Sequence, residues 1–307
     1  MGISQYIKEI GRGKDGARAL SRAQAADLFG QVLDGTVTDL EVGGFCLAMR
    51  IKGETDAEMA GFLDATYARL TMVPACDRPL VVLPSYNGAR KLPVLTPLLA
   101  LLLAREGLPV LVHGTATEST RISAQNVLLA LGIPAQAAIQ KIANGEVAYA
   151  TTELLCPGLK RLLDVRRAVG LRNPGHSLVK LMAPCDGPAL VVSSYTHPEY
   201  AVSMAATFAL MESNALLLRG TEGEVVADAR RAPQMTGYLR GQPQLMQEAQ
   251  SGPLAAVPEL PKEIDADSTA TYIRDVLAGR KPVPAPIAQQ VAHILRLTHH
   301  ISEPATV

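Results

Sequence analysis

The sequence predicts a small helical domain, made of N-terminal helices plus later helices, together with a larger α/β domain. Two observations predict this fold. Apolar residues recur at helical spacing through residues 21–70, whereas from about residue 80 short apolar runs alternate with turn clusters and helical segments. A further helical stretch at 156–180 interrupts that alternation. The two parts are therefore expected to be interleaved along the chain.

Three helices account for the N-terminal helical part. The first ends at Gly35, which stops a run of apolar residues at helical spacing. The second spans Leu40–Met49 and has small residues on one face, which allows close packing. The third spans Thr55–Leu70, in which Thr55 and Glu58 have the spacing of a capping box.

The α/β part is predicted from four short apolar runs with helices between them. These runs are expected to be strands of a sheet with both faces covered. The strands are Leu80–Leu83, Val110–Val112, Leu190–Ser194 and Ala215–Leu218, and the helices are Leu95–Glu106, a helix closing with Asn126–Leu131, and Pro198–Met211. The Pro-rich C-terminal third is expected to form loops at 253–263 and 279–290 around a helix at Ser268–Ala278.

Composition excludes several classes of protein. Lys plus Arg and Asp plus Glu both number 29, so the zero net charge excludes a uniformly basic chain but not a local basic groove. Aromatic residues are only 4%, which argues against a base-stacking platform as the main means of binding nucleic acid. The four cysteines form no CxxC pair, so neither a zinc site nor a disulfide framework is predicted.

Motifs that would assign a location or a chemistry are absent from the sequence. The chain starts without an apolar signal-peptide core, and its longest uncharged apolar run, Leu92–Ala104, is too short to span a bilayer. We expect a soluble, cytoplasmic protein with no membrane partner. No Walker loop, GxGxxG, HExxH, GxSxG or metal-binding carboxylate pair is found. The sequence therefore identifies no catalytic residue, no metal ligand and no cofactor.

The turn cluster at residues 84–91, PSYNGARK, lies between a predicted strand and a predicted helix. Backbone N–H groups at such a junction can hold a phosphate, and Arg90 and Lys91 add positive charge. An ordinary connecting turn with two solvated cations explains the cluster equally well. The residues of the loop alone leave both interpretations open.

A second basic cluster lies in residues 156–180. Six basic residues face a single acid, Asp164, which gives a local excess of five positive charges in a neutral protein. The six are Lys160, Arg161, Arg166, Arg167, Arg172 and Lys180. Clustered cations attract phosphate oxygens. A solvated helix face is the usual explanation of such a run, and these residues alone favour it slightly.

Several segments, in order, resemble anthranilate phosphoribosyltransferase and the class II nucleoside phosphorylases. They are residues 34–65, VHG at 112–114, ALG at 130–132, CPGLK at 156–160, VRRAVGLRN at 165–173 and RGTEGEV at 219–225. The resemblance implies a helical domain completed by later helices, an α/β domain with a central mixed sheet, and a substrate cleft between the two. It also implies a homodimer formed through the helical domain. The implied boundaries are 1–70 plus about 153–180 for the helical domain, and 71–152 with 181–307 for the α/β domain.

The catalytic positions of that family are changed in this chain. Its glycine-rich GTGGD loop corresponds to Pro84–Gly88, and its KHGNR motif corresponds to Val112–Ala116, without either cation. Its magnesium-binding Asp-Glu pair falls on Val225 and Val226, which have no oxygen ligand for a hard cation. Arg172 alone keeps a substrate-binding arginine of the family. The shared fold does not by itself transfer the activity, and we expect a protein that is not a working transferase.

A more specific resemblance is to the YbiB-type branch of this fold, which binds nucleic acid without sequence preference. It is carried by IKEIGRGK at 7–14, PSYNGARK at 84–91, PVLVHG at 109–114 and GTEGEV at 220–225. The resemblance implies a basic groove between the domains that binds the backbone of DNA or RNA. The implied nucleic-acid-binding residues are Arg90, Lys91, Lys160, Arg161, Arg166, Arg167 and Arg172.

Two alternatives to nucleic-acid binding remain open. The first is a phosphoribosyltransferase or phosphorylase that acts on a small phosphorylated substrate. The second is a ligand-free interaction protein that dimerises through its helices.

Overall fold

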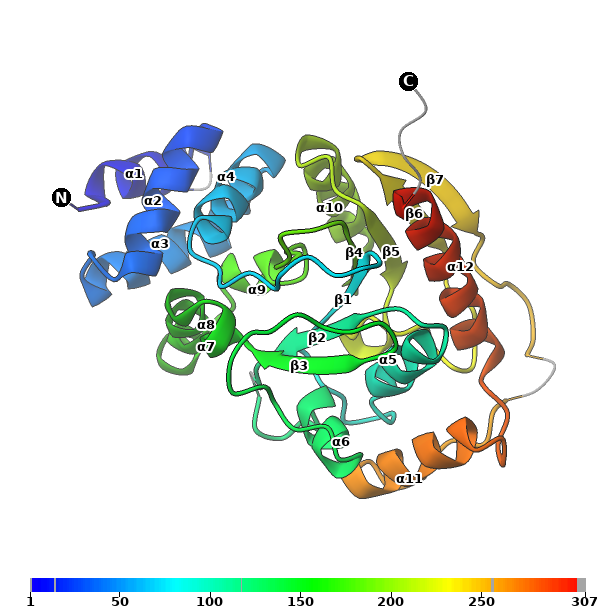
Figure 1. Ribbon diagram of the computed structural model, residues 1–307. Coiled ribbons are helices and arrows are strands. Elements are labelled where there is room, and N and C mark those ends of the chain that lie inside the picture. Colours follow the sequence, from blue (N-terminus) through cyan, green and yellow to red (C-terminus); the bar gives the residue numbers. More distant parts are fainter. Residues whose placement is uncertain (1, 14, 117, 255–256, 303–307) are drawn as a thin grey trace.

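The computed structural model describes residues 2–13, 15–116, 118–254 and 257–302, so the outer limits of the expected domains, 1 and 307, lie outside the described residues. The chain begins with four helices that pack together (Figure 1). They are α1 (Ser4–Ile10), α2 (Arg22–Asp34), α3 (Asp39–Lys52) and α4 (Asp56–Tyr67). The three helices predicted between residues 21 and 70 are thus present.

Local sequence explains where these helices start and how they pack. Ser21, Thr38 and Thr55 each form a complete capping box with the side chain three residues later. The rings of Phe29 and Phe62, from α2 and α4, stack with centroids 4.6 Å apart. Pairs of this kind add to the stabilisation gained by burying the rings.

Within the described residues, seven strands form one mixed sheet in the order β3-β2-β1-β4-β5-β6-β7. The first five strands along the chain run parallel, β6 runs antiparallel to β5, and β7 runs antiparallel to β6. Their bounds are β1 Leu80–Ser85, β2 Val110–Gly114, β3 Val147–Thr151, β4 Ala189–Tyr195, β5 Ala215–Arg219, β6 Met235–Leu239 and β7 Gln242–Gln247. From β1 the chain proceeds to one side of the sheet through β2 and β3, and then to the other side through β4 and β5. The β1/β4 boundary is therefore the switch point, where α/β folds place their ligands.

Alternate residues of the strands face two different apolar clusters. Val82 and Val191 point toward the face covered by α10 (Pro198–Leu210) and the helical domain. Val81 and Leu190 point to the opposite face. That face is covered by α5 (Thr96–Arg105) and α12 (Ala285–Ser302), with α6 (Ala124–Ala130) and α11 (Ala266–Leu277) beside them (Figure 1).

The chain returns to the helical domain after β3. There it forms α7 (Thr152–Leu155), α8 (Pro157–Val169) and α9 (Gly175–Leu178), and α8 packs against α2 (Figure 1). The predicted interleaving of helical and α/β parts is present. The exact domain boundaries stay a prediction. No helix in the described part of the chain is long and apolar enough to cross a membrane.

The prediction of a loop at 279–290 is wrong in its second half, because α12 begins at Ala285. Pro284 precedes this helix and Pro286 lies in its first turn, where a proline does not disturb the hydrogen bonds. The prolines that predicted a loop therefore mark the start of a helix. The strands β3, β6 and β7 were not predicted.

Candidate functional site

A cavity of about 450 Å³ lies where the helical domain meets the carboxyl ends of the parallel strands. The helical domain contributes the end of α3 and the start of α4. The α/β side contributes Ser194, near the end of β4, Thr196, just after that strand, and the first turns of α10. Arg172, His176 and Lys180, from the α9 region, also line it. The structure thus places a cavity at the carboxyl end of β4, one of the two strands of the switch point, and Arg172 is the sequence-predicted site residue that lines it.

Lys180 brings a cation to the wall of this cavity. Its Nζ donates to the carbonyl oxygen of Gly223 at 3.1 Å and lies 3.5 Å from that of Ser194. Burial lowers the pKa of Lys180 to about 8, the nearby Glu224 carboxylate opposes that change, and Arg172 adds to it. Near neutral pH the cavity therefore has a positive wall formed by Lys180 and Arg172.

The loop after β1 donates its N–H groups to carboxylates of the same chain. Oε1 of Glu224 accepts hydrogen bonds from the backbone N–H groups of Asn87, at 3.0 Å, and Gly88, at 2.8 Å. Oε2 of Glu224 accepts from the hydroxyls of Ser85, at 2.6 Å, and Thr96, at 3.0 Å. The donors that the sequence predicts for a phosphate are engaged by this buried side chain.

A second carboxylate holds the rest of the loop. Oε1 of Glu222 accepts from the backbone N–H groups of Lys91, at 2.9 Å, and Leu92, at 3.0 Å, and the N–H of Arg90 is 3.3 Å away. Glu222 and Glu224 lie in the short segment after β5 that includes a 3₁₀ turn at Thr221–Gly223. More than a hundred residues separate the acids from the loop, so nothing local in the sequence reveals this pairing.

The magnesium site of the resembled enzymes does not fit this chain. Val225 and Val226 are buried in the apolar core and offer no side-chain oxygen. The adjacent Glu224 already accepts four hydrogen bonds. Among the described residues no group of three or more His, Cys, Asp or Glu side chains could hold a metal ion.

Three guanidinium groups surround one carboxylate near the cavity. Glu118 pairs with Arg166 and with Arg121, each at 2.8 Å, and Arg172 lies 3.8 Å away. Hydrogen bonds from Arg166 and Arg121 hold the pKa of Glu118 at about 2. We call these four residues the arginine cluster. Its three positive charges exceed its single negative charge by two.

The arginine cluster also connects α8 to the loop after β1. Arg121 Nη1 donates to the carbonyl oxygen of Gly88 at 3.3 Å and lies 3.8 Å from Glu222. In the same loop, the side chains of Arg90 and Lys91 are exposed and form no ion pair among the described residues. The structure therefore brings four of the predicted residues to one region: Arg90, Lys91, Arg166 and Arg172.

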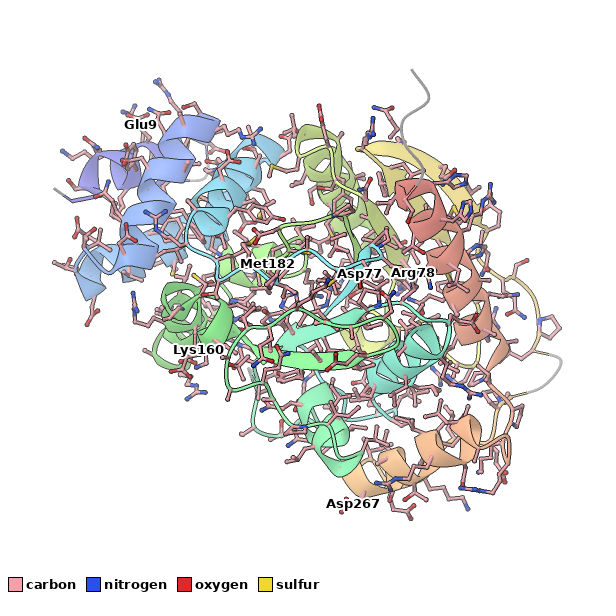
Figure 2. All side chains as sticks on the ribbon, in the orientation of Figure 1. Glu9, Asp77, Arg78, Lys160, Met182 and Asp267 are labelled. Carbon is pink, nitrogen blue, oxygen red and sulfur yellow. The ribbon has the colours of Figure 1, made fainter. Side chains whose placement is uncertain are left out.

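The other three predicted cations have different neighbours. Lys160, labelled in Figure 2, forms an ion pair with Asp164. Arg167 is mostly exposed and lies 3.5 Å from the same carboxylate. Arg161 donates to the carbonyl oxygen of Leu33 at 2.8 Å, near the end of α2. The structure does not bring Lys160 and Arg161 to the cavity.

Sequence reasoning missed five residues of this region: Glu118, Arg121, Lys180, Glu222 and Glu224. Lys180 is counted in the basic cluster but is not singled out as a site residue. Arg121 and Glu118 lie three residues apart in the stretch TESTR, a spacing at which side chains can pair. The two glutamates of GTEGEV follow a predicted strand, which is only a weak indication that they belong to the site.

His113 lies in β2 and is fully buried. Its Nδ1 is 2.9 Å from the Tyr86 hydroxyl, and burial lowers its pKa to about 3. The imidazole is therefore neutral at physiological pH and belongs to the core.

Comparisons with known proteins agree with the fold. Residues 4–69 match the helical bundle domain of the glycosyl transferase family. The chain is 40% identical over 317 residues to the uncharacterized protein YbiB of Escherichia coli (strain K12). This match covers 100% of this chain and 97% of YbiB. It is 30% identical over 275 residues to anthranilate phosphoribosyltransferase of Sorangium cellulosum, covering 85% of this chain and 77% of that enzyme.

Solved structures show the same fold at lower identity. Anthranilate phosphoribosyltransferase (TrpD) from Thermus thermophilus superposes with a TM-score of 0.71 at 22% identity, covering 96% of this chain and 88% of that one. The Saccharomyces cerevisiae enzyme in complex with PRPP and Mg gives a TM-score of 0.69 at 14% identity, covering 97% and 89%. The chain therefore belongs to the family of homologous proteins that includes YbiB and anthranilate phosphoribosyltransferase.

Proposed function

We propose that this protein binds the phosphate backbone of DNA or RNA, without sequence preference, along the basic region beside the cavity. The observation that supports the proposal most is the arginine cluster, in which Arg121, Arg166 and Arg172 exceed the charge of Glu118. Arg90 and Lys91 extend the positive charge along the adjacent loop. Cations that contact phosphate oxygens fix a nucleic acid in place but do not read base edges, so little sequence preference is expected.

The state of the loop after β1 argues against the chemistry of the related transferases. Transfer from a diphosphate requires electrostatic stabilisation of the leaving group. In this chain the N–H groups of the loop are engaged by Glu222 and Glu224, and the positions of the metal-binding acids are valines. The side-chain cations remain as the groups that can bind phosphate.

The test is fluorescence anisotropy of labelled oligonucleotides of about 30 nucleotides, single- and double-stranded and of unrelated sequence, in a salt series. Log affinity for duplex should fall against log salt with a slope of about 0.9 per phosphate contact. Similar affinity for all sequences is expected. Absence of binding at low salt would remove the proposal.

A charge-reversal pair tests the location. Arg90→Glu with Lys91→Glu should weaken binding by at least about tenfold and reduce the salt slope by about two contacts. The matched control, Lys141→Glu with Arg280→Glu, reverses two exposed cations that pair with Asp77 and Asp275 elsewhere on the molecule. Equal effects of the two pairs would show that only net charge matters and would contradict the assigned region.

A second candidate function is a phosphoribosyltransferase or phosphorylase acting on a small phosphorylated substrate. The relationship to anthranilate phosphoribosyltransferase favours it, and the cavity of about 450 Å³ at the carboxyl end of β4 is large enough for a small ligand. Turnover of phosphoribosyl diphosphate in the presence of magnesium, lost in Arg172→Gln, would support it. Nucleic-acid binding that Arg172→Gln weakens, without any turnover by the unmodified protein, would support the first candidate instead.

A further inference from the structure

The contacts of Glu224 form a complete site for an oxyanion. Two backbone N–H groups converge on one carboxylate oxygen, and two hydroxyls converge on the other, all within 3.0 Å. Glu224 is 1% exposed, and the donors Ser85, Asn87 and Thr96 are also buried. Converging N–H and hydroxyl donors of this kind also hold phosphate in proteins.

The segment that contains Glu224 has a backbone shaped to enter this site. Gly223 has a φ of +87°, and a Cβ at this position would lie 1.8 Å from Nδ2 of Asn87. Glu222 adopts a φ of +52°, which a residue with a side chain seldom does. The carbonyl oxygen of Glu222 accepts from Nδ2 of Asn87 at 3.0 Å. The insertion of Glu224 therefore depends on a local conformation that costs energy, and its hydrogen bonds offset that cost.

We propose that Glu224 is a built-in anion, which occupies an oxyanion site on the loop after β1 and thereby closes it to external phosphate. The donors around Glu224 are saturated by one carboxylate, so a phosphate cannot bind them while the side chain is in place. Removal of the carboxylate leaves four buried donors without an acceptor, which is unfavourable. A small oxyanion from solution can then accept the hydrogen bonds that the carboxylate of Glu224 accepted. The proposal does not depend on nucleic-acid binding.

The test uses Glu224→Ala, titrated with inorganic phosphate by calorimetry at constant ionic strength. The variant should bind phosphate at least about tenfold more tightly than the unmodified protein, because phosphate can accept hydrogen bonds from the donors that the carboxylate leaves free. Phosphate and formate should each raise its thermal midpoint relative to chloride, and neither should do so for the unmodified protein. Glu224→Gln, which keeps the volume of the side chain, should stay closed to phosphate.

A second substitution in the variant shows where the phosphate binds. Thr96→Val removes one of the four donors, so the double variant should lose most of the phosphate affinity gained by Glu224→Ala. An unchanged affinity in the double variant would mean that phosphate binds elsewhere and would overturn the proposal.

Two further outcomes also decide the question. A folded Glu224→Ala protein that binds phosphate no better than the unmodified protein overturns the proposal. So does phosphate binding by the unmodified protein that Thr96→Val abolishes, because the site would then be open with Glu224 present. If Glu224→Ala does not fold, Glu224→Ser is titrated in the same way, since its short side chain still leaves room for phosphate.

Discussion

Lys180 illustrates, at the scale of a single residue, how burial changes the charge of the cavity wall. Its pKa is lowered to about 8 by burial, with Arg172 acting in the same direction and Glu224 opposing. The unfolded chain has a lysine pKa of about 10.4. Between these two values the unfolded state binds more protons, so the free energy of unfolding rises with pH in this window.

This difference predicts a pH dependence of stability. The gain between pH 8 and about 10.4 should approach about 3 kcal/mol in the unmodified protein relative to Lys180→Met, which has no amine to titrate. Urea unfolding of both proteins at intervals from pH 7 to 10 measures it. A difference between the two that stays constant with pH would contradict the lowered pKa.

The contacts and pKa values of individual residues were the features that the sequence predicted least well. The loop between β1 and α5 was predicted, although its first two residues, Pro84 and Ser85, belong to the strand, and Arg172, predicted as a nucleic-acid-binding residue, lines the cavity. Glu224 was not predicted, because its partners lie more than a hundred residues away and only the fold brings them together. The apolar environment that lowers the pKa of Lys180 is likewise a property of tertiary packing.

At the scale of elements, the close packing of α2 against α4 depends on a single glycine. Gly61 lies in α4, and a Cβ there would be 2.3 Å from the carbonyl oxygen of Arg22 and 2.9 Å from Cβ of Ala25. The glycine therefore permits the two helices to approach closely. A glycine inside a helix otherwise costs roughly 1 kcal/mol relative to alanine.

Two matched substitutions follow from this contact. Gly61→Ala should lower the free energy of unfolding by about 1–3 kcal/mol, because the added methyl group forces the helices apart. Gly43→Ala, in α3, should raise it by up to about 1 kcal/mol, since its Cβ would meet nothing within 4 Å. Urea unfolding compares them. A stabilising effect of both would show that α2 and α4 can separate without loss.

Elements with strong local signals were predicted and those without were not. The capping box at Thr55 and the apolar runs of β1, β2, β4 and β5 were predicted directly from the residues, whereas the capping boxes at Ser21 and Thr38 were found only in the structure. By contrast, β7 is polar, with the sequence QPQLMQ, and is held by its pairing with β6. Its pairing is a long-range property that alternation in the sequence does not reveal.

At the scale of the whole molecule, α3 has an apolar face that no other described part of the chain covers. Leu40, Leu47 and Ile51 are 86%, 48% and 63% exposed, and they lie at helical spacing. An exposed apolar face of this kind often marks an interface. We therefore keep the proposal, made from the sequence resemblance, that two copies associate through their helical domains.

This proposal predicts the oligomeric state. Light scattering after size-exclusion chromatography should give a dimer for the unmodified protein and a monomer for Leu47→Glu with Ile51→Glu. The control, Leu245→Glu, changes a residue of β7 that is 55% exposed and should leave the dimer intact. A monomeric unmodified protein would remove the proposal, and a dimer that survives the double substitution would move the interface elsewhere.

The carboxylates that hold the loop after β1 are covalently part of the chain, and this has a thermodynamic consequence. A loop ordered by a diffusible anion gains stability in proportion to the logarithm of the ligand concentration. A tethered anion has a fixed effective concentration, set by the chain that carries it. We therefore expect the backbone of residues 85–92 to stay ordered whether phosphate around the protein is scarce or abundant.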